Sequence, residues 1–165
     1  MASRYIKRFY PAVKSVRIVG MDPLKQELEL AGLKVSGGQE ACPFGGELIN
    51  IEKFNNYAMD ADVDLVLVGL DQNFNYTKLC LASLYIQTGK AAFVCTNEDH
   101  FISIGNMQYP AAGSIVEGIQ ITLNNEQGSQ LTDRPAVVGM PHPFAMDVLK
   151  EDHGIGEAED ICLLV

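Results

Sequence analysis

The sequence lacks the short motifs and long apolar runs that would assign it to several common protein classes. It contains no G-x-G-x-x-G, G-x-x-x-x-G-K-[ST], G-x-S-x-G or H-E-x-x-H segment, so nucleotide binding loses its best support. The run from Val63 to Leu70 is among the longest apolar stretches, and Asp64 interrupts it. A membrane-spanning helix needs roughly 20 apolar residues, so we expect none.

Basic residues are also scarce. Lys and Arg number 12 against 21 Asp and Glu, which leaves a formal net charge of -9. A chain with this charge repels nucleic-acid backbones and anionic lipid surfaces, so both are disfavoured as partners. The segment of residues 1–8 carries a positive charge from Arg4, Lys7 and Arg8, but no apolar segment or small-residue cleavage site follows it. We therefore expect a cytoplasmic location.

Cysteines are few and scattered. Cys42, Cys80, Cys95 and Cys162 form no C-x-x-C pair, and no histidine lies at zinc-finger spacing. Three of the four lie in apolar runs, where a free cysteine behaves as a small hydrophobic residue. We expect buried free thiols in a reducing compartment. Cys42, in a loop before Pro43, is the candidate for a reactive thiol.

The chain does contain alternating strand and helix patterns. With 165 residues and 47% hydrophobic content, it can form a buried core. Short β-rich runs separated by helical spacing predict an α/β fold, with a Rossmann-like, mostly parallel sheet and helices on both faces. We expect residues 35–44 to form a surface loop and 124–134 a domain junction. Predicted strands lie at 16–19, 65–68, 91–94, 136–138 and 161–165, and predicted helices at 22–31, 75–87, 113–124 and 143–152.

Polar residues follow two of these strands. Asp71 comes after 65–68, where it could contact a ligand, although a turn or helix-capping carboxylate is the favoured alternative. Thr96, Asn97, Asp99 and His100 follow 91–94. The carboxyl end of a parallel strand is where ligands bind in such sheets, so these four are candidates to face a substrate. A polar turn in which Asn97 and Asp99 bond their own backbone is an equal alternative.

A third strand-end loop contains Gly139, Met140, Pro141 and His142. The two prolines around His142 restrict its backbone, and a histidine held there could act in acid–base chemistry. A histidine with no neighbouring carboxylate in the sequence is more often an ordinary loop residue.

The order of these segments resembles the haloacid dehalogenase superfamily, in its branch of 4-nitrophenylphosphatases, phosphoglycolate phosphatases and pyridoxal phosphate phosphatases. The resemblance covers nearly the whole chain. It rests on Val16-Arg17-Ile18-Val19-Gly20, Val68-Gly69-Leu70-Asp71, Phe74-Asn75-Tyr76-Thr77-Lys78-Leu79, Thr96-Asn97-Glu98-Asp99, Pro110-Ala111-Ala112-Gly113-Ser114 and Val138-Gly139-Met140-Pro141-His142-Pro143-Phe144.

This resemblance implies a Mg²⁺-dependent phosphatase with a Rossmann-like core and a large α/β cap inserted in it. Residues 16–130 are similar to that cap, 1–15 to a residual core helix and linker, and 131–165 to part of the core. The implied substrate is a small phosphorylated metabolite, and Mg²⁺ is expected for the full-length family.

The sequence departs from this family at its chemical groups. The family uses an aspartate nucleophile in D-x-D-G and late carboxylates in G-D-x-x-x-T-D, and neither segment occurs in these 165 residues. Where the family carries lysine in V-G-K-P, this chain has Met140. The full-length enzyme is expected to hydrolyse small phosphate monoesters. We expect this chain to be a truncated, inactive version of that enzyme, and we expect the chain itself to bind no Mg²⁺. The alternative is a non-catalytic binding or dimerisation module derived from the cap, and in either case a homo-oligomer is expected.

Overall fold

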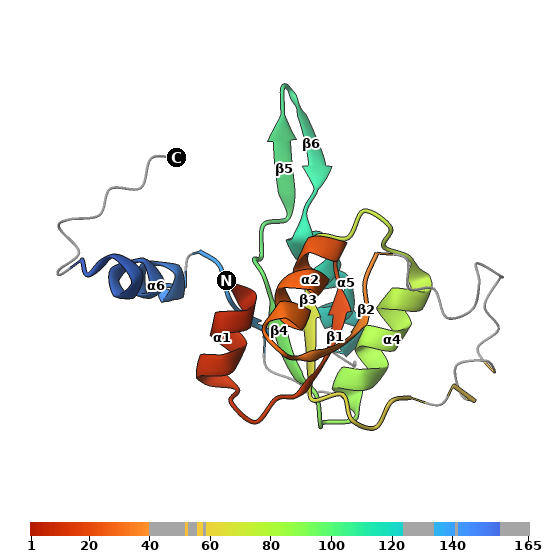
Figure 1. The fold of residues 1–165 in the computed structure, drawn as a ribbon. Coiled ribbons are helices and arrows are strands. Elements are labelled where there is room, and N and C mark those ends of the chain that lie inside the picture. Colours follow the sequence, from red (N-terminus) through yellow and green to blue (C-terminus); the bar gives the residue numbers. More distant parts are fainter. Residues whose placement is uncertain (40–51, 53–55, 58, 124–133, 141, 156–165) are drawn as a thin grey trace.

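The fold is described by a computed structural model, which covers residues 1–39, 52, 56–57, 59–123, 134–140 and 142–155. Strands and helices alternate along most of the chain (Figure 1). In order, the elements are α1 (Ala2–Phe9), β1 (Ser15–Val19), α2 (Asp22–Leu30), β2 (Lys34–Gly37), β3 (Leu65–Val68), α4 (Tyr76–Gln87), β4 (Ala92–Cys95), β5 (Phe101–Ile104), β6 (Met107–Pro110), α5 (Ala112–Leu123), β7 (Ala136–Val137) and α6 (Phe144–His153).

The main sheet has five parallel strands in the order β2-β1-β3-β4-β7. The chain runs from β1 out to β2 and then returns past β1 to form β3, so the strand order reverses between β1 and β3. Loops at the carboxyl ends of strands beside such a reversal form the ligand-binding crevice of open α/β sheets. The predicted mostly parallel α/β fold is confirmed.

Each face of the sheet has its own apolar core, covered by its own helices. In β3, Val66 and Val68 face α4 and α5, whereas Leu65 and Leu67 face α1, α2 and α6. All four side chains are fully buried, which is why this strand reads as a continuous apolar run rather than an alternating one. Helices therefore cover both faces, as the sequence predicts.

The predicted loop at 35–44 is wrong for residues 35–37, which belong to strand β2. Residues 34–37 pair in parallel with β1, with Val35 opposite Val16 and Gly37 opposite Ile18. Gly37 has a φ of +89°, and a side chain there would overlap the Ile18 carbonyl oxygen. Gly37 thus marks the close approach of two strands. Residues 40–44 lie outside the described residues.

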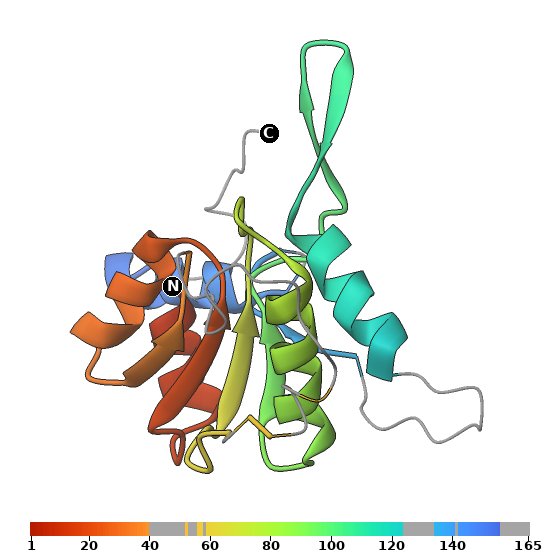
Figure 2. The same cartoon turned by 90° about the vertical axis from the view of Figure 1, so that its right-hand side faces the viewer.

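The β5–β6 hairpin was not predicted. Its strands pair antiparallel through a two-residue connection, in which Gly105 has a φ of +61°. Glycine with positive φ at the first turn position is typical of hairpin turns. The hairpin extends away from the main sheet (Figures 1 and 2).

Segments from both ends of the described chain pack on the same sheet. Tyr5 and Ile6 of α1 share an apolar core with Phe144 and Val148 of α6, and β7 pairs with β4. Ion pairs also join the two helices, Arg4 with Asp152 and Arg8 with Glu151. The division into 1–15, 16–130 and 131–165 stays a prediction. Residues 124–133, where the junction is expected, and the predicted strand 161–165 lie outside the described residues.

Cys95 is a free, fully buried thiol, as predicted for a cysteine in an apolar strand. Burial raises its pKa to about 12, so at pH 8 roughly one molecule in ten thousand carries the reactive thiolate. We expect iodoacetamide to leave Cys95 unmodified in the folded protein and to modify it in urea, as read by peptide mass spectrometry. Cys80, which is free and partly exposed, is the internal comparison. Equal labelling of both in the folded state would contradict the packing of β4. Cys42 and Cys162 lie outside the described residues.

Candidate functional site

The candidate site lies at the carboxyl edge of the sheet, where β1, β3, β4 and β7 end side by side. Backbone hydrogen bonds continue one residue past β3 and β4 and two residues past β7. Gly69 N–H donates to Val19 (2.8 Å), Thr96 N–H to Val68 (2.8 Å) and Gly139 N–H to Thr96 (2.8 Å). These bonds fix the start of each loop relative to the sheet. The loops after β3, β4 and β7 are therefore held together as one polar edge.

Glycines allow these loops to lie against one another. A Cβ on Gly69 would lie 3.2 Å from the side chain of Thr96, and one on Gly139 would lie 2.6 Å from the Thr96 carbonyl oxygen. The 2.6 Å contact at Gly139 is closer than real Cβ atoms come to another atom, so only glycine fits there without a shift of the backbone. The structure thus brings Gly69, Thr96, Asn97 and Gly139 together. Thr96 and Asn97 are half-buried there.

Asp71 follows β3 and is buried, with both carboxylate oxygens occupied. Oδ1 accepts from the Asn73 N–H (2.9 Å), and Oδ2 accepts from Lys78 Nζ (2.6 Å). Lys78 Nζ also donates to the Gln39 carbonyl oxygen (2.9 Å). This geometry supports the turn-carboxylate alternative, because Asp71 ties its own loop to α4. The N-cap of α4 is Asn75, whose side chain accepts from the Lys78 N–H.

Asn97, Asp99 and His100 connect β4 to the hairpin. Asn97 Oδ1 accepts from the Asp99 N–H (3.3 Å), which is the polar turn given as the alternative above. The Asp99 carbonyl oxygen accepts from the Gly113 N–H (2.8 Å) and so anchors this loop to α5. The side chains of Asp99 and His100 are exposed, and His100 Nε2 lies 3.8 Å from a carboxylate oxygen of Glu117.

The loop after β7 places Met140 and His142 differently. Met140 is 56% exposed, next to Gly139 at the polar edge. His142 is half-buried against α1, with its ring centroid 5.5 Å from that of Tyr5, and its Nδ1 accepts from the Phe144 N–H (3.1 Å). These contacts give His142 a structural position at the start of α6. Pro141 lies outside the described residues.

The described residues do not fit a Mg²⁺ ion. Among them no three His, Cys, Asp or Glu side chains gather at one place. Asp71 is the buried carboxylate of the polar edge, and Lys78 already neutralises it. Hard cations such as Mg²⁺ prefer carboxylate oxygens that are free to coordinate.

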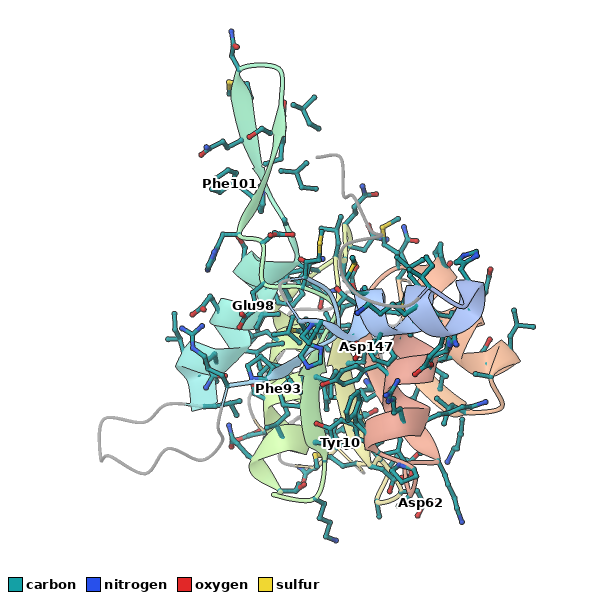
Figure 3. All side chains as sticks on the ribbon, turned by 90° about the vertical axis from the view of Figure 1, so that its left-hand side faces the viewer. Tyr10, Asp62, Phe93, Glu98, Phe101 and Asp147 are labelled. Atoms are coloured by element: carbon teal, nitrogen blue, oxygen red, sulfur yellow. The ribbon has the colours of Figure 1, made fainter. Side chains whose placement is uncertain are left out.

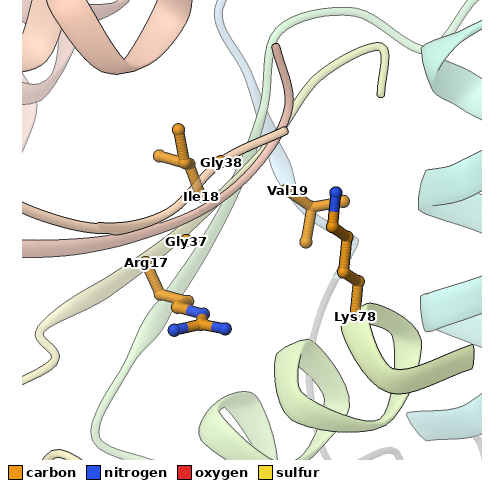
Figure 4. A pocket seen from close by; sticks show the side chains of 6 residues that line it. All are labelled: Arg17, Ile18, Val19, Gly37, Gly38 and Lys78. Atoms are coloured by element: carbon orange, nitrogen blue, oxygen red, sulfur yellow. The ribbon is translucent and has the colours of Figure 1, made fainter. Parts of the chain in front are cut away.

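Two buried cations were missed by sequence reasoning. Lys78 and Arg17 line a small pocket with Gly37 and Gly38 (Figure 4). Arg17 is 8% exposed, and its guanidinium lies 5.9 Å from the ring centroid of Tyr85. In Figure 4 the two charged groups point in different directions, so they do not form one anion cradle. A charged residue inside an apolar run was the signal available in the sequence.

The sequence and the fold of this chain are similar to those of several phosphatases. No family model matches the chain. It is 30% identical to the chloroplastic phosphoglycolate phosphatase 1A of Arabidopsis thaliana over 99% of this chain and 42% of that protein. It is 28% identical to the glycerol-3-phosphate phosphatase of Gallus gallus over 97% of this chain and 48% of that protein. A crystal structure described as a putative p-nitrophenyl phosphatase from Bacillus subtilis matches with a TM-score of 0.66 and 22% identity, over 94% of this chain and 48% of that one.

These matches confirm the resemblance drawn from the sequence. The chain is related to the phosphoglycolate and 4-nitrophenyl phosphatase branch of the haloacid dehalogenase superfamily. The chain spans about half the length of the curated relatives it matches. In the part of the chain that the structure describes, no helix has the length and apolar character needed to cross a membrane.

Proposed function

We propose that this chain is the cap and partial core of a phosphatase that hydrolyses small phosphate monoesters in its full-length form. Residues 16–130 would be the cap, 131–165 the returning core, and 1–15 a residual core helix. The alignment supports this proposal, because it runs through almost the entire chain in relatives named for phosphoglycolate and glycerol 3-phosphate. Both are small organic phosphates, so the proposed substrate is a small phosphorylated metabolite. The proposed location is the cytoplasm.

One structural observation supports the proposal that these residues face a substrate. Gly139 N–H binds the Thr96 carbonyl oxygen, which holds the loop after β7 against the loop after β4. Met140, which follows Gly139, therefore lies at the same edge of the sheet as the half-buried Thr96 and Asn97. We propose that Thr96 and Asn97 lie toward the substrate, with Asp99 and His100 at the mouth of that edge.

The 165-residue chain itself is proposed to be inactive. It contains neither D-x-D-G nor G-D-x-x-x-T-D, so no aspartate is available in the context that forms an aspartyl-phosphate in this superfamily. Met140 carries a neutral thioether, which cannot stabilise the negative charge of a transferring phosphoryl group as an ammonium can. Mg²⁺ is proposed as a cofactor of the full-length family only.

A chimera tests the proposed function. The matching segment of the Arabidopsis phosphoglycolate phosphatase would be replaced by residues 1–165 of this chain, with and without Met140→Lys. We expect both chimeras to fold and Met140→Lys to raise kcat for phosphoglycolate about 100-fold, because one correctly placed charge on the transition state contributes on that order. The measurement is phosphate release under saturating substrate.

Leu149→Lys provides the matched control. It adds the same charge at another partly exposed position of the same chain, on α6 rather than at the polar edge, and should leave kcat unchanged. Equal activity of the Met140 and Met140→Lys chimeras would contradict the role given to this loop. A folded Met140→Lys chimera without activity would contradict the proposal that this chain can serve as the phosphatase cap.

A further inference from the structure

An open cavity of about 330 Å³ lies between α1 and α6. The two helices pack next to each other on one face of the main sheet (Figure 3), where Asp147 marks α6 and Tyr10 follows α1. Basic side chains of α1 and mainly apolar side chains of α6 line the cavity. They are Arg4, Lys7 and Arg8 from α1 and Phe144, Val148 and Glu151 from α6. A cavity of this volume can hold a small organic molecule.

Positive charge is concentrated at this cavity. The chain has 12 Lys and Arg and a net charge of -9, yet three of the 12 line this one cavity. Arg4, Lys7 and Arg8 are three and four positions apart on α1, so they lie on one side of the helix. The helix itself contains no Asp or Glu. The carboxylates that balance this charge therefore come from α6.

Two of the three cations are paired with those carboxylates, and the third is not. Arg4 donates to both carboxylate oxygens of Asp152 (2.5 and 2.9 Å), and Arg8 donates to Glu151 (2.7 Å). The Lys7 ammonium is exposed and forms no hydrogen bond or ion pair in the part of the chain that the structure describes. The cavity thus has one uncompensated positive charge beside two arginines that their partners hold in place.

The rest of the lining is apolar. Phe144 and Val148 are buried where they line the cavity, and the Arg8 guanidinium lies 6.0 Å from the ring centroid of Phe144. The hydrocarbon stems of Lys and Arg contact apolar groups while their charged ends reach water, and guanidinium groups stack on flat rings. The lining therefore matches an apolar ring that carries one negative group.

We propose that this cavity binds a small aromatic anion, with the anionic group at Lys7 and the ring against Phe144 and Val148. The anionic group is a carboxylate or a phosphoryl group, since an ammonium binds either as a point charge. One charge-assisted contact and a small apolar body give modest affinity, so we expect a dissociation constant of about 0.1–1 mM. The proposal does not depend on the phosphatase assignment, because no bond forms or breaks at this cavity.

Titration of the isotope-labelled 165-residue chain with small ligands, followed by amide chemical shifts, tests this proposal. Benzoate and phenylphosphonate carry both a ring and an anionic group, acetate carries only the anionic group, and benzyl alcohol carries only the ring. Benzoate and phenylphosphonate should shift amides of α1 and α6 along saturable curves, and the tighter of the two identifies the preferred anionic group. Acetate and benzyl alcohol should bind at least about 10-fold more weakly.

Lys7→Gln should weaken the binding of benzoate at least about fivefold, because it removes the unpaired charge at the cavity. Lys90→Gln is the matched control. It removes an exposed lysine that does not line the cavity and should change the dissociation constant less than about twofold. Both lysines are exposed, so we expect both variants to fold, and far-ultraviolet circular dichroism checks each one.

Any of four results would overturn the proposal. They are the absence of saturable shifts up to about 10 mM benzoate, equally tight binding of acetate or benzyl alcohol, a loss in Lys7→Gln no greater than in Lys90→Gln, and shifts confined to the polar edge around Thr96 and Gly139. The last result would mean that the anion binds at the candidate substrate site instead. It would leave the proposed phosphatase function unchanged.

Discussion

Replacing Lys78 with methionine should lower the free energy of unfolding by about 3–5 kcal/mol, as measured by urea denaturation. The Lys78 and Asp71 side chains are 3% and 0% exposed, and their charged atoms lie 2.6 Å apart. Removing the lysine leaves the Asp71 carboxylate buried opposite a thioether. A buried charge without its partner costs about this much in proteins.

Two further variants identify the cause of this loss. Asp71→Asn keeps an oxygen that can accept from the Asn73 N–H but removes the charge. Combined with Lys78→Met, it should recover at least about 1 kcal/mol, because no unpaired charge remains. Lys90→Met removes an exposed lysine and should change stability by less than about 0.5 kcal/mol. A loss below about 1 kcal/mol for Lys78→Met would show that Asp71 reaches solvent or another partner.

Gly113→Ala should destabilise the fold by about 3 kcal/mol or more. Gly113 lies in the first turn of α5, and its N–H donates to the Asp99 carbonyl oxygen. An added Cβ would overlap the Glu98 carbonyl oxygen and lie 2.6 Å from the Glu98 carbonyl carbon. Because these are backbone atoms, the strain cannot be relieved by a rotamer change, and α5 or the loop after β4 must shift. Thermal or urea unfolding measures the loss.

Gly118→Ala in the same helix is the control, and its expected effect has the opposite sign. The nearest atom to its added Cβ is Leu79 Cδ1 at 4.0 Å, an ordinary contact. Alanine in a helix interior is more favourable than glycine by about 0.5–1 kcal/mol, so this variant should be more stable than the original. If Gly113→Ala were tolerated equally well, the loop of Glu98 and Asp99 could not lie against α5 as described.

Much of the fold could be predicted from local signals that agree with the packing. Pro23 lies at the start of α2, and Asn75 caps α4 through its side chain. Asp22 looks like the cap of α2 in the sequence, but it is the first residue of that helix and Met21 is its N-cap. Apolar runs give β1, β3 and β4, with Arg17 as the charged residue within β1, since strands covered on both faces have no polar side to display. These signals lie within a few residues of the elements they define, so a single sequence contains them.

Features that depend on contacts between distant segments could not be predicted. Gly37 looks like a loop residue until the Ile18 carbonyl is placed beside it. The partner of Asp71 is Lys78, seven positions further along the chain, and the sequence does not reveal that both are buried. The sequence did indicate that Asp71, Thr96 and Gly139 follow strands, but the direct contact of Gly139 with Thr96 required the order in which β4 and β7 lie in the sheet.

Hydrolysis of 4-nitrophenyl phosphate by the purified 165-residue chain, with Mg²⁺ and with chelator, tests the central claim most directly. The claim is that this chain has the fold of a phosphatase cap and partial core without the groups that perform the chemistry. We expect folded protein, by circular dichroism, with release of 4-nitrophenol no faster than in buffer under either condition. Rapid turnover that requires Mg²⁺ and stops with chelator would contradict the claim.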